Sequence, residues 1–133
     1  MREIALNTTG RTDFVDLTFE VQAAVGELGL DEGAVVVFNP HTTAAVTINE
    51  GADPDVVRDM TAALDRIVPW QDGYHHAEGN AAAHIKASMF GSSVTVIVSK
   101  GRLQLGTWQK IWLCDFDGPR KRRIWIKALP TGS

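Results

Sequence analysis

Three of the four histidines in this chain, His75, His76 and His84, lie within ten residues of one another. Histidine is the side chain whose ordinary pKa permits proton transfer near neutral pH, and it is also the commonest metal ligand in proteins. Asn80 and Ser88 stand four residues before and after His84, which places the three side chains on one face of a helix. The spacing therefore predicts a short helix that presents a polar, functional face with His84 at its centre.

Two chemistries are open to these histidines. The fourth one, His41, stands in the segment 40–43 (PHTT), a turn between two apolar runs, and turns often carry side chains into clefts. If this turn meets the predicted helix, His41, His76 and His84 are candidates for catalytic acid–base residues or for the ligands of one zinc ion. Zinc needs three or four ligands in a tetrahedral arrangement, and the spacing matches no HExxH pair. The sequence leaves both possibilities open, and His75 is expected to be an exposed loop residue.

A carboxylate cluster follows the second of these apolar runs, with Glu50 at its end and Asp53 and Asp55 shortly after. Glu50 ends the candidate segment that begins at the turn 40–43, and the three carboxylates form a local acidic cluster at a predicted helix start. The dipeptide Asp53-Pro54, however, is typical of a helix start, since Asp is a favoured N-cap and Pro is favoured at the first helical position. Capping is therefore the favoured interpretation of Asp53.

The segment 101–109 (GRLQLGTWQ) supplies a third group of candidate residues, the ligand-binding side chains Arg102, Thr107 and Gln109. Arg102 has a guanidinium fork that suits a phosphate or a carboxylate, and Thr107 adds a hydroxyl group. Gln109 is unusual in an apolar strand, and it either satisfies a bulge or faces a pocket. The segment matches neither a P-loop nor a dinucleotide fingerprint, so no nucleotide cofactor is expected.

Composition narrows the class of partner and the compartment. The net charge of −3 gives no reason to expect nucleic acid or an anionic membrane, and the basic run 120–123 (RKRR) is interpreted as a solvated strand edge or turn. Cys114, the single cysteine, lies in an apolar run and is expected to be a buried, inert thiol. The N-terminus shows no signal-peptide pattern and no apolar run reaches the length of a membrane span, so a cytoplasmic protein is expected.

Hydrophobic periodicity predicts a single domain over residues 1–133 with eight strands and two to three helices. Strands are predicted over 3–8, 14–17, 33–39, 43–49, 93–99, 102–105, 108–116 and 121–129, and helices over 19–28, 54–67 and 81–89. Thr18 is the expected cap of the first helix, and Asp117-Gly118 is expected to join the last two strands as a hairpin turn. This order is typical of an α+β fold with a mainly antiparallel sheet.

Apolar patterns add three expectations about packing. Ile85 and Met89 form a stripe beside the polar face of the third helix, and this stripe is expected to dock the helix on the core. The continuously apolar run 34–38 predicts a strand covered on both faces. The strand over 108–116 is also apolar on both faces, which is more than so small a domain is expected to cover alone, so we expect an oligomer.

Five motifs in their order resemble the YjbQ family, small proteins often labelled secondary thiamine-phosphate synthases. They are PHTTAAVTINE at 40–50, DPDV at 53–56, YHHAEGNAAAHIKASMFGSS at 74–93, GRLQLGTWQ at 101–109 and DFDGPR at 115–120. The resemblance implies a two-sheet α+β sandwich that assembles as a homotrimer. The site residues that it implies are His41, Glu50, His76, Asn80 and His84, with Arg102, Thr107 and Gln109 lining the same cleft from a neighbouring subunit. Lys110 departs from the family pattern, which typically has Gly there, and would alter access beside Gln109.

The function that the resemblance implies is a thiamine-phosphate synthase activity, which joins a pyrimidine methyl diphosphate to a thiazole phosphate and releases pyrophosphate. Its expected parts are Mg²⁺ on the carboxylates, Arg102 at a phosphate, and His76 or His84 as acid or base. Two alternatives remain open. One is a metal-assisted hydrolase with a three-histidine site, and the other is a non-catalytic trimer that binds a small phosphorylated or anionic metabolite.

Overall fold

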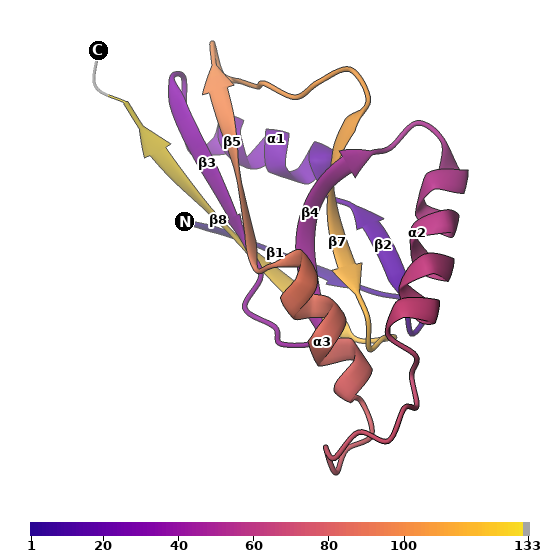
Figure 1. Ribbon diagram of the computed structural model, residues 1–133. Helices are drawn as coiled ribbons and strands as arrows, with labels where there is room; N and C mark the ends of the chain where they lie inside the picture. The colour runs from indigo at the N-terminus through magenta and orange to yellow at the C-terminus, as the bar shows by residue number, and fades with distance from the viewer. Residues whose placement is uncertain (132–133) are drawn as a thin grey trace.

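The computed structural model describes residues 1–131, and it places three helices and eight strands in an α+β arrangement (Figure 1). The strands are β1 (Arg2–Asn7), β2 (Asp13–Asp16), β3 (Gly33–Phe38), β4 (Ala44–Glu50), β5 (Ser93–Ser99), β6 (Arg102–Leu103), β7 (Gln109–Asp115) and β8 (Lys121–Pro130). The helices are α1 (Thr18–Glu27), α2 (Pro54–Ile67) and α3 (Ala81–Phe90). The predicted elements therefore exist, with ends that shift by a few residues.

All strand pairs are antiparallel and form two sheets, which confirms the expected sandwich. The larger sheet has the order β1-β8-β3-β5-β6, and the smaller one has the order β2-β7-β4. Their inner faces meet in a core to which the larger sheet contributes Val35 and Ile124 and the smaller sheet contributes Val46 and Ile111. Helix α1 adds Val21, fully buried, to the same core. Alternation of apolar side chains along each strand directs one face of each sheet into this layer.

The outer face of the smaller sheet is covered within the chain by α2 and α3, which Figure 1 shows on that side of the molecule. A second apolar cluster joins Leu64 of α2 and Ala83 of α3 to Cys114 and Phe116. Both faces of β7 are thereby covered, since Ile111 lies in the core between the sheets. For β7 itself the inference of exposed apolar surface is wrong, because α2 and α3 bury its outer face. Trp108, which the prediction included in this strand, precedes β7 and is 63% exposed.

The outer face of the larger sheet is the apolar surface that remains exposed. Ile97 of β5 is 66% exposed, and Phe38 stacks on Trp125 with ring centroids 5.9 Å apart. Along β3 only the inward side chains, Val35 and Val37, are fully buried. The predicted two-sided burial of the run 34–38 is therefore wrong for the single chain, whose larger sheet is covered on one face.

The predicted hairpin between the last two strands does not form. Strand β7 pairs with β2 and β4, whereas β8 pairs with β1 and β3, so both edges of each strand are already occupied. The chain crosses from one sheet to the other at 116–120. A buried ion pair spans this crossing, with Arg122 Nη2 2.6 Å from Asp115 Oδ1. The interpretation of the basic run as solvated is thus wrong for Arg122, which is 4% exposed.

The helix ends show which of the predicted capping residues act as caps. Asp53 caps α2 as predicted, because its side chain accepts a hydrogen bond from the backbone N–H of Asp55. Thr18 does not cap α1, whose N-cap is Leu17; the Thr18 hydroxyl instead accepts from the backbone N–H of Ile111 and ties the helix to β7. Among residues 1–131, no helix is long and apolar enough to cross a membrane.

Candidate functional site

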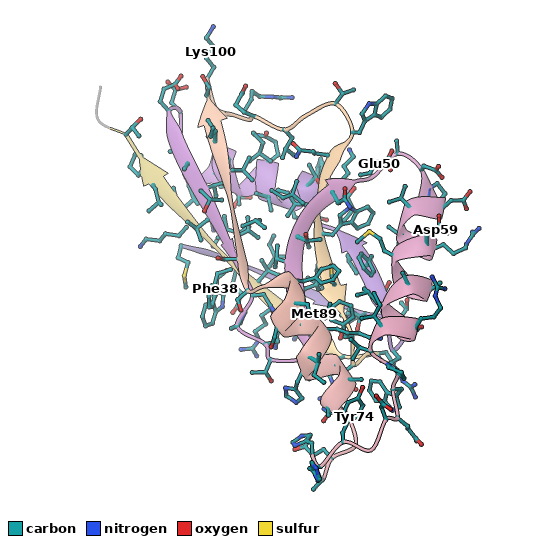
Figure 2. All side chains as sticks on the ribbon, in the orientation of Figure 1. Phe38, Glu50, Asp59, Tyr74, Met89 and Lys100 are labelled. Atoms are coloured by element: carbon teal, nitrogen blue, oxygen red, sulfur yellow. The ribbon has the colours of Figure 1, made fainter. Side chains whose placement is uncertain are left out.

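A polar groove of about 400 Å³ lies at one end of the sandwich, where four segments distant in the chain meet. The groove is formed by the β3–β4 turn, the loop before α3, the first turns of α3, and the crossing from β7 to β8. Its lining includes His41, Thr43, His76, Glu78, Asn80, His84, Asp117, Arg120 and Arg122. Figure 2 shows Tyr74, which precedes this region in the chain, in the lower part of the molecule and Glu50 in its upper part.

His76 and His84 are two histidines whose rings lie side by side in the groove. Their ring centroids are 5.2 Å apart and their planes meet at 83°. His84 is held by helix α3 and His76 by the loop that leads into it, so the pair combines one rigid group with one on a connecting segment. Two imidazoles at this separation can share one substrate, with one ring accepting a proton while the other donates one.

His41 reaches the same groove but is already engaged. Its Nε2 accepts a hydrogen bond of 2.8 Å from the backbone N–H of Arg123, so the proton of the neutral ring resides on Nδ1. Burial, followed by the positive charge of Arg122, holds the pKa of His41 below its ordinary value. His41 is therefore a neutral, oriented ring, and its Nε2 is not free to bind a metal.

The three histidines do not form a metal site in this geometry. Within residues 1–131, no group of three His, Cys, Asp or Glu side chains is placed to hold a metal ion. The chemistry of the donors agrees, since His41 uses Nε2 for a backbone hydrogen bond and zinc requires three or four free ligands. The residues present do not fit a three-histidine zinc site.

Helix α3 docks on the core through a different stripe from the predicted one. Ile85 and Met89 are 40% and 54% exposed, whereas Ala82, Ala83 and Ala87 are buried. Small side chains let the helix approach β4 closely, and the aliphatic stem of the buried Lys86 extends to Asp65 of α2. The expectation that Ile85 and Met89 anchor the helix is wrong, although His84 still faces the groove.

The neighbours of His84 on the helix have other partners. The Ser88 hydroxyl donates to the backbone carbonyl of His84 rather than to its ring. Asn80 Nδ2 donates to Asp117 Oδ2 at 2.8 Å. Asn80 is 7% exposed, and its Oδ1 atom is buried with no hydrogen-bond partner among the described residues. Buried polar atoms are nearly always hydrogen-bonded, so this acceptor is an exception beside the groove.

A buried guanidinium forms the base of the groove. Arg122 donates from Nε and Nη2 to both carboxylate oxygens of Asp115, and Nη2 also donates to the hydroxyl of Thr43. Asp115 accepts further hydrogen bonds from the Thr8 hydroxyl and the backbone N–H of Asp117. Burial by itself would raise the pKa of Asp115, but the hydrogen bonds from Arg122 and Thr8 outweigh it and hold the pKa below its usual range.

Four charged groove residues are not among the site candidates predicted from the sequence, namely Glu78, Asp117, Arg120 and Arg122. The signal for Arg122 was present in the strand period, since Arg122 alternates in phase with Ile124 and Ile126, the inward residues of β8. An arginine in an inward phase requires a buried acceptor. Asp115, the acid at the end of the apolar strand β7, supplies it. Asp117 was interpreted only as a turn residue.

The other predicted residues lie away from this groove. Glu50 accepts from the backbone N–H of Asp53, and Asp55 pairs with Arg58, so the carboxylate cluster stabilises the start of α2. These carboxylates do not fit a Mg²⁺ site within one chain, because capping and an ion pair already engage them. Figure 2 shows Glu50 near the top of α2, away from Tyr74 in the lower part of the molecule.

The segment 101–109 is also distant from the histidines in the chain's own fold. Arg102 lines a separate surface pocket of about 360 Å³ together with Phe19 and Lys110. Gln109 Oε1 accepts from the backbone N–H of Gly106, so its side chain satisfies the local backbone just before β7. Thr107 is exposed. Cys114 is buried as expected, and burial raises the pKa of its thiol, which suits an inert side chain.

Comparison with known proteins places the chain in a family. Residues 2–131 match the family model described as UPF0047 protein YjbQ-like. The chain is 48% identical to the UPF0047 protein YugU of Bacillus subtilis over 97% of this chain and 98% of that one. It is 42% identical to a UPF0047 protein of Methanocaldococcus jannaschii over 93% of this chain and 90% of the other.

Solved structures agree with these matches. A conserved protein of the YjbQ/UPF0047 family from Clostridium acetobutylicum is similar to this chain with a TM-score of 0.94 and 50% identity, over 96% of this chain and 98% of that one. A hypothetical protein from Aeropyrum pernix has a TM-score of 0.93 at 33% identity, over 98% of both chains. The motifs, the two-sheet fold and these similarities agree, and the chain belongs to the YjbQ/UPF0047 family.

Proposed function

We propose that the protein is a small-molecule enzyme that binds a phosphorylated or otherwise anionic metabolite in the polar groove and uses His84 and His76 as acid and base. The observation that carries the proposal is a buried, hydrogen-bonded arginine in the same groove as two histidine rings 5.2 Å apart. Perturbed or buried polar groups that converge in one concavity are the usual sign of a reactive site.

Arg122 is suited to anion recognition because it is pre-oriented. Two of its three nitrogens are held by Asp115 and Thr43, which leaves Nη1 as the donor directed to other partners. A guanidinium held this way loses little side-chain entropy when it binds a phosphate oxygen. Since Asp115 neutralises its charge, the affinity would come from oriented hydrogen bonds rather than from net positive charge.

His84 is the proposed centre of the chemistry. Helix α3 fixes its position, and misplacement of a catalytic group by about 1 Å can cost on the order of 100-fold in rate. His76, on the loop, is the proposed partner in proton transfer. The Nδ1–H of His41 remains available as a neutral donor, because Nε2 is occupied by the Arg123 backbone.

The reaction to test first is the thiamine-phosphate synthase reaction that the family resemblance implies. In this reaction the bond between the pyrimidine methylene carbon and the diphosphate oxygen breaks, a bond forms from that carbon to the thiazole nitrogen, and pyrophosphate leaves. The groove supports the anion-binding part of this proposal through Arg122 and Arg120. The position of Glu50 does not support a protein-held Mg²⁺ beside the histidines of the same chain.

The alternative of a metal-assisted hydrolase has one observation in its favour, the adjacent rings of His76 and His84, but His41 uses Nε2 for the Arg123 backbone and two ligands are fewer than zinc requires. Metal analysis of untagged protein tests it. About one equivalent of zinc per chain, lost in a His76→Gln variant, would favour the hydrolase over the metal-free acid–base proposal.

The test of the proposal compares the wild type with His84→Gln and with the matched control His75→Gln. His75 is an exposed loop residue outside the set that lines the groove, so the control makes the same chemical change without altering the site. Pyrophosphate release is measured with the pyrimidine diphosphate and thiazole phosphate, and ligand binding is measured by calorimetry. We expect His84→Gln to lose at least about 100-fold in rate while His75→Gln retains full activity.

Each contrary outcome identifies a different error. Equal rates for the wild type and His84→Gln would remove His84 from the chemistry. Binding of both phosphorylated compounds without turnover would favour the non-catalytic metabolite-binding trimer. Failure of any phosphorylated compound to bind, with the fold intact by thermal denaturation, would overturn the proposal as a whole.

A further inference from the structure

A second pocket, of about 470 Å³, adjoins the polar groove along helix α3. The two concavities share His41, Thr42 and His84 in their linings, so they meet where these three side chains lie. His41 and His84 are partly exposed and Thr42 is exposed, so a ligand can reach this junction from solution. The space open to a ligand beside His84 is therefore larger than the polar groove alone.

The second pocket exists because short side chains surround it. Ala44 begins β4, Ala87 follows His84 on the same face of α3, and Gly91 ends the helix with a φ of +97°, a conformation that favours glycine. Ser88 and Ser92 add exposed hydroxyl groups to the lining. The small residues that let α3 approach β4 thus also leave a hollow beside the C-terminal half of the helix.

The two pockets differ in the charge of their linings. The polar groove has four charged side chains, namely Glu78, Asp117, Arg120 and Arg122. Among the described residues, only the two shared histidines can carry a charge in the lining of the second pocket. Transfer of an ionic group out of water is unfavourable without a charged or hydrogen-bonded partner. The second pocket is therefore suited to an uncharged group.

The direction of α3 agrees with this division. Its N-terminal end, which carries a partial positive charge, borders the polar groove at Asn80 and His84. Its C-terminal end, which carries a partial negative charge, borders the second pocket at Ala87 and Gly91. An anion is favoured at the first end and disfavoured at the second.

The helix also sets the length of a ligand that would occupy both pockets. Helix α3 has 10 residues and is therefore about 15 Å long. A ligand that extends from the polar groove into the second pocket passes His84, because His84 lines both. A small anion fills only the groove and leaves the second pocket to solvent.

We infer that the second pocket is a subsite for an uncharged, ring-sized part of the metabolite whose anionic part occupies the polar groove, with the junction of the two parts beside His84. The inference rests on the proposed function, which supplies the anionic part and the role of His84. It narrows the substrate class to phosphate or carboxylate compounds that carry a neutral ring. The volume of each pocket falls within the range of about 300–1,000 Å³ that is typical of ligand sites.

Phosphate monoesters of two sizes test this inference. Methyl phosphate and benzyl phosphate carry the same anionic group, but only benzyl phosphate carries a ring. Their dissociation constants are measured by calorimetry with the wild type and with Ser88→Phe and Ser92→Phe, which fill the second pocket from two different segments. Met89→Phe is the matched control, because Met89 follows Ser88 on α3, is 54% exposed and lies outside the lining of the pocket.

We expect benzyl phosphate to bind the wild type at least about tenfold more tightly than methyl phosphate, since burial of an apolar ring is favourable. The ratio should be retained in Met89→Phe and fall to about one in Ser88→Phe and Ser92→Phe, with the affinity for methyl phosphate unchanged. All three replaced residues are exposed, so the variants should fold, and thermal denaturation checks this. If one serine variant does not fold, the other gives the comparison.

The outcomes separate the inference from the proposal beneath it. If methyl phosphate and benzyl phosphate bind the wild type equally, the subsite is overturned and the anion-binding groove stands. If the preference for benzyl phosphate persists in both serine variants, the ring binds elsewhere and the subsite is again overturned. An equal loss in Met89→Phe would have the same meaning, because the effect would not be specific to the pocket. If neither monoester binds, the proposed function fails and the inference fails with it.

Discussion

The buried pair of Asp115 and Arg122 is the residue-level feature on which the groove depends. It links the two sheets at the crossing from β7 to β8 and orients the guanidinium toward the groove. A buried ion pair is weak evidence for stability relative to an apolar core, but removing one partner leaves an uncompensated charge. The pair therefore combines a structural constraint with the placement of a candidate ligand-binding group.

Removal of one partner should destabilise the protein strongly. Arg122→Met leaves the Asp115 carboxylate buried and unpaired, and we expect it to lower the free energy of unfolding by about 3–5 kcal/mol. Urea denaturation measures this change. The double variant Asp115→Leu/Arg122→Met should recover part of the loss, and a single-variant loss below about 1 kcal/mol would show that the pair is not buried as described.

The lowered pKa of His41 predicts a pH dependence of stability. Because burial and Arg122 hold its pKa in the fold below the value of about 6.5 expected in the unfolded chain, the unfolded state binds more protons between the two values. The contribution of His41 is therefore complete above about pH 6.5 and is lost as the pH falls from there through the folded-state pKa.

Thermal denaturation between pH 7.5 and pH 5.0 tests this dependence. His41→Gln retains an acceptor near the position of Nε2 for the Arg123 N–H but does not titrate in this range. We expect acidification to lower the melting temperature of the wild type more than that of His41→Gln. Parallel curves for the two proteins would mean that the folded state does not favour the neutral form of His41.

At the level of elements, α3 is the helix that positions the candidate site, and small residues determine how it packs. Its buried stripe consists of alanines and Lys86, whereas its larger apolar side chains are exposed. Close approach of the helix to β4 brings His84 into the groove with the β3–β4 turn. A larger side chain in the stripe would move the helix away and open the site.

Ala83→Leu tests this packing. Ala83 is fully buried in the cluster with Phe116, so the added methylenes must displace neighbours, and we expect a loss of about 1–3 kcal/mol in the free energy of unfolding. Met89→Ala is the comparison on the exposed stripe, with an expected change within about 0.5 kcal/mol. Urea denaturation measures both changes. A larger loss in Met89→Ala than in Ala83→Leu would mean that Ile85 and Met89 anchor the helix after all.

At the level of the whole molecule, the apolar surface left open lies on the outer face of the larger sheet. Ile97 and Leu129 are exposed there, and Phe38 stacks on Trp125. Exposed apolar patches on a sheet are typical of surfaces that associate. We propose this face, rather than β7, as the contact in the homotrimer that the family resemblance implies.

Light scattering measures the assembly directly. The wild type should have about three times the chain mass of 14.5 kDa. Ile97→Lys places a charge on the proposed contact and should yield a folded species of lower mass, because burial of an unpaired charge is unfavourable. Trp112 packs inside the chain against the cluster on the smaller sheet, so Trp112→Lys should unfold the protein instead. A wild type that stays monomeric at micromolar concentration would contradict the trimer.

The periodic patterns of the sequence determined the elements and much of the candidate site. The periods of two and of 3.6 residues located the eight strands and the three helices of residues 1–131, although the apolar stripe that they indicated for α3 is not the one that packs. The same local reasoning placed His84 on a helix and His41 in a turn. The motif resemblance then identified the family, which the comparisons confirm.

Only the tertiary structure decided which elements meet. The consecutive strands β7 and β8 lie in different sheets, although the turn at Asp117-Gly118 joins them. Each strand pairs on both edges with strands that are distant in the sequence. The face of α3 that docks was decided by close packing of alanines against β4, a competition between stripes that periodicity alone does not resolve. Arg122 lines the groove because it forms an ion pair with Asp115 on the other side of the crossing between the sheets. Such contacts depend on the whole chain being folded, so the local pattern of residues does not contain them.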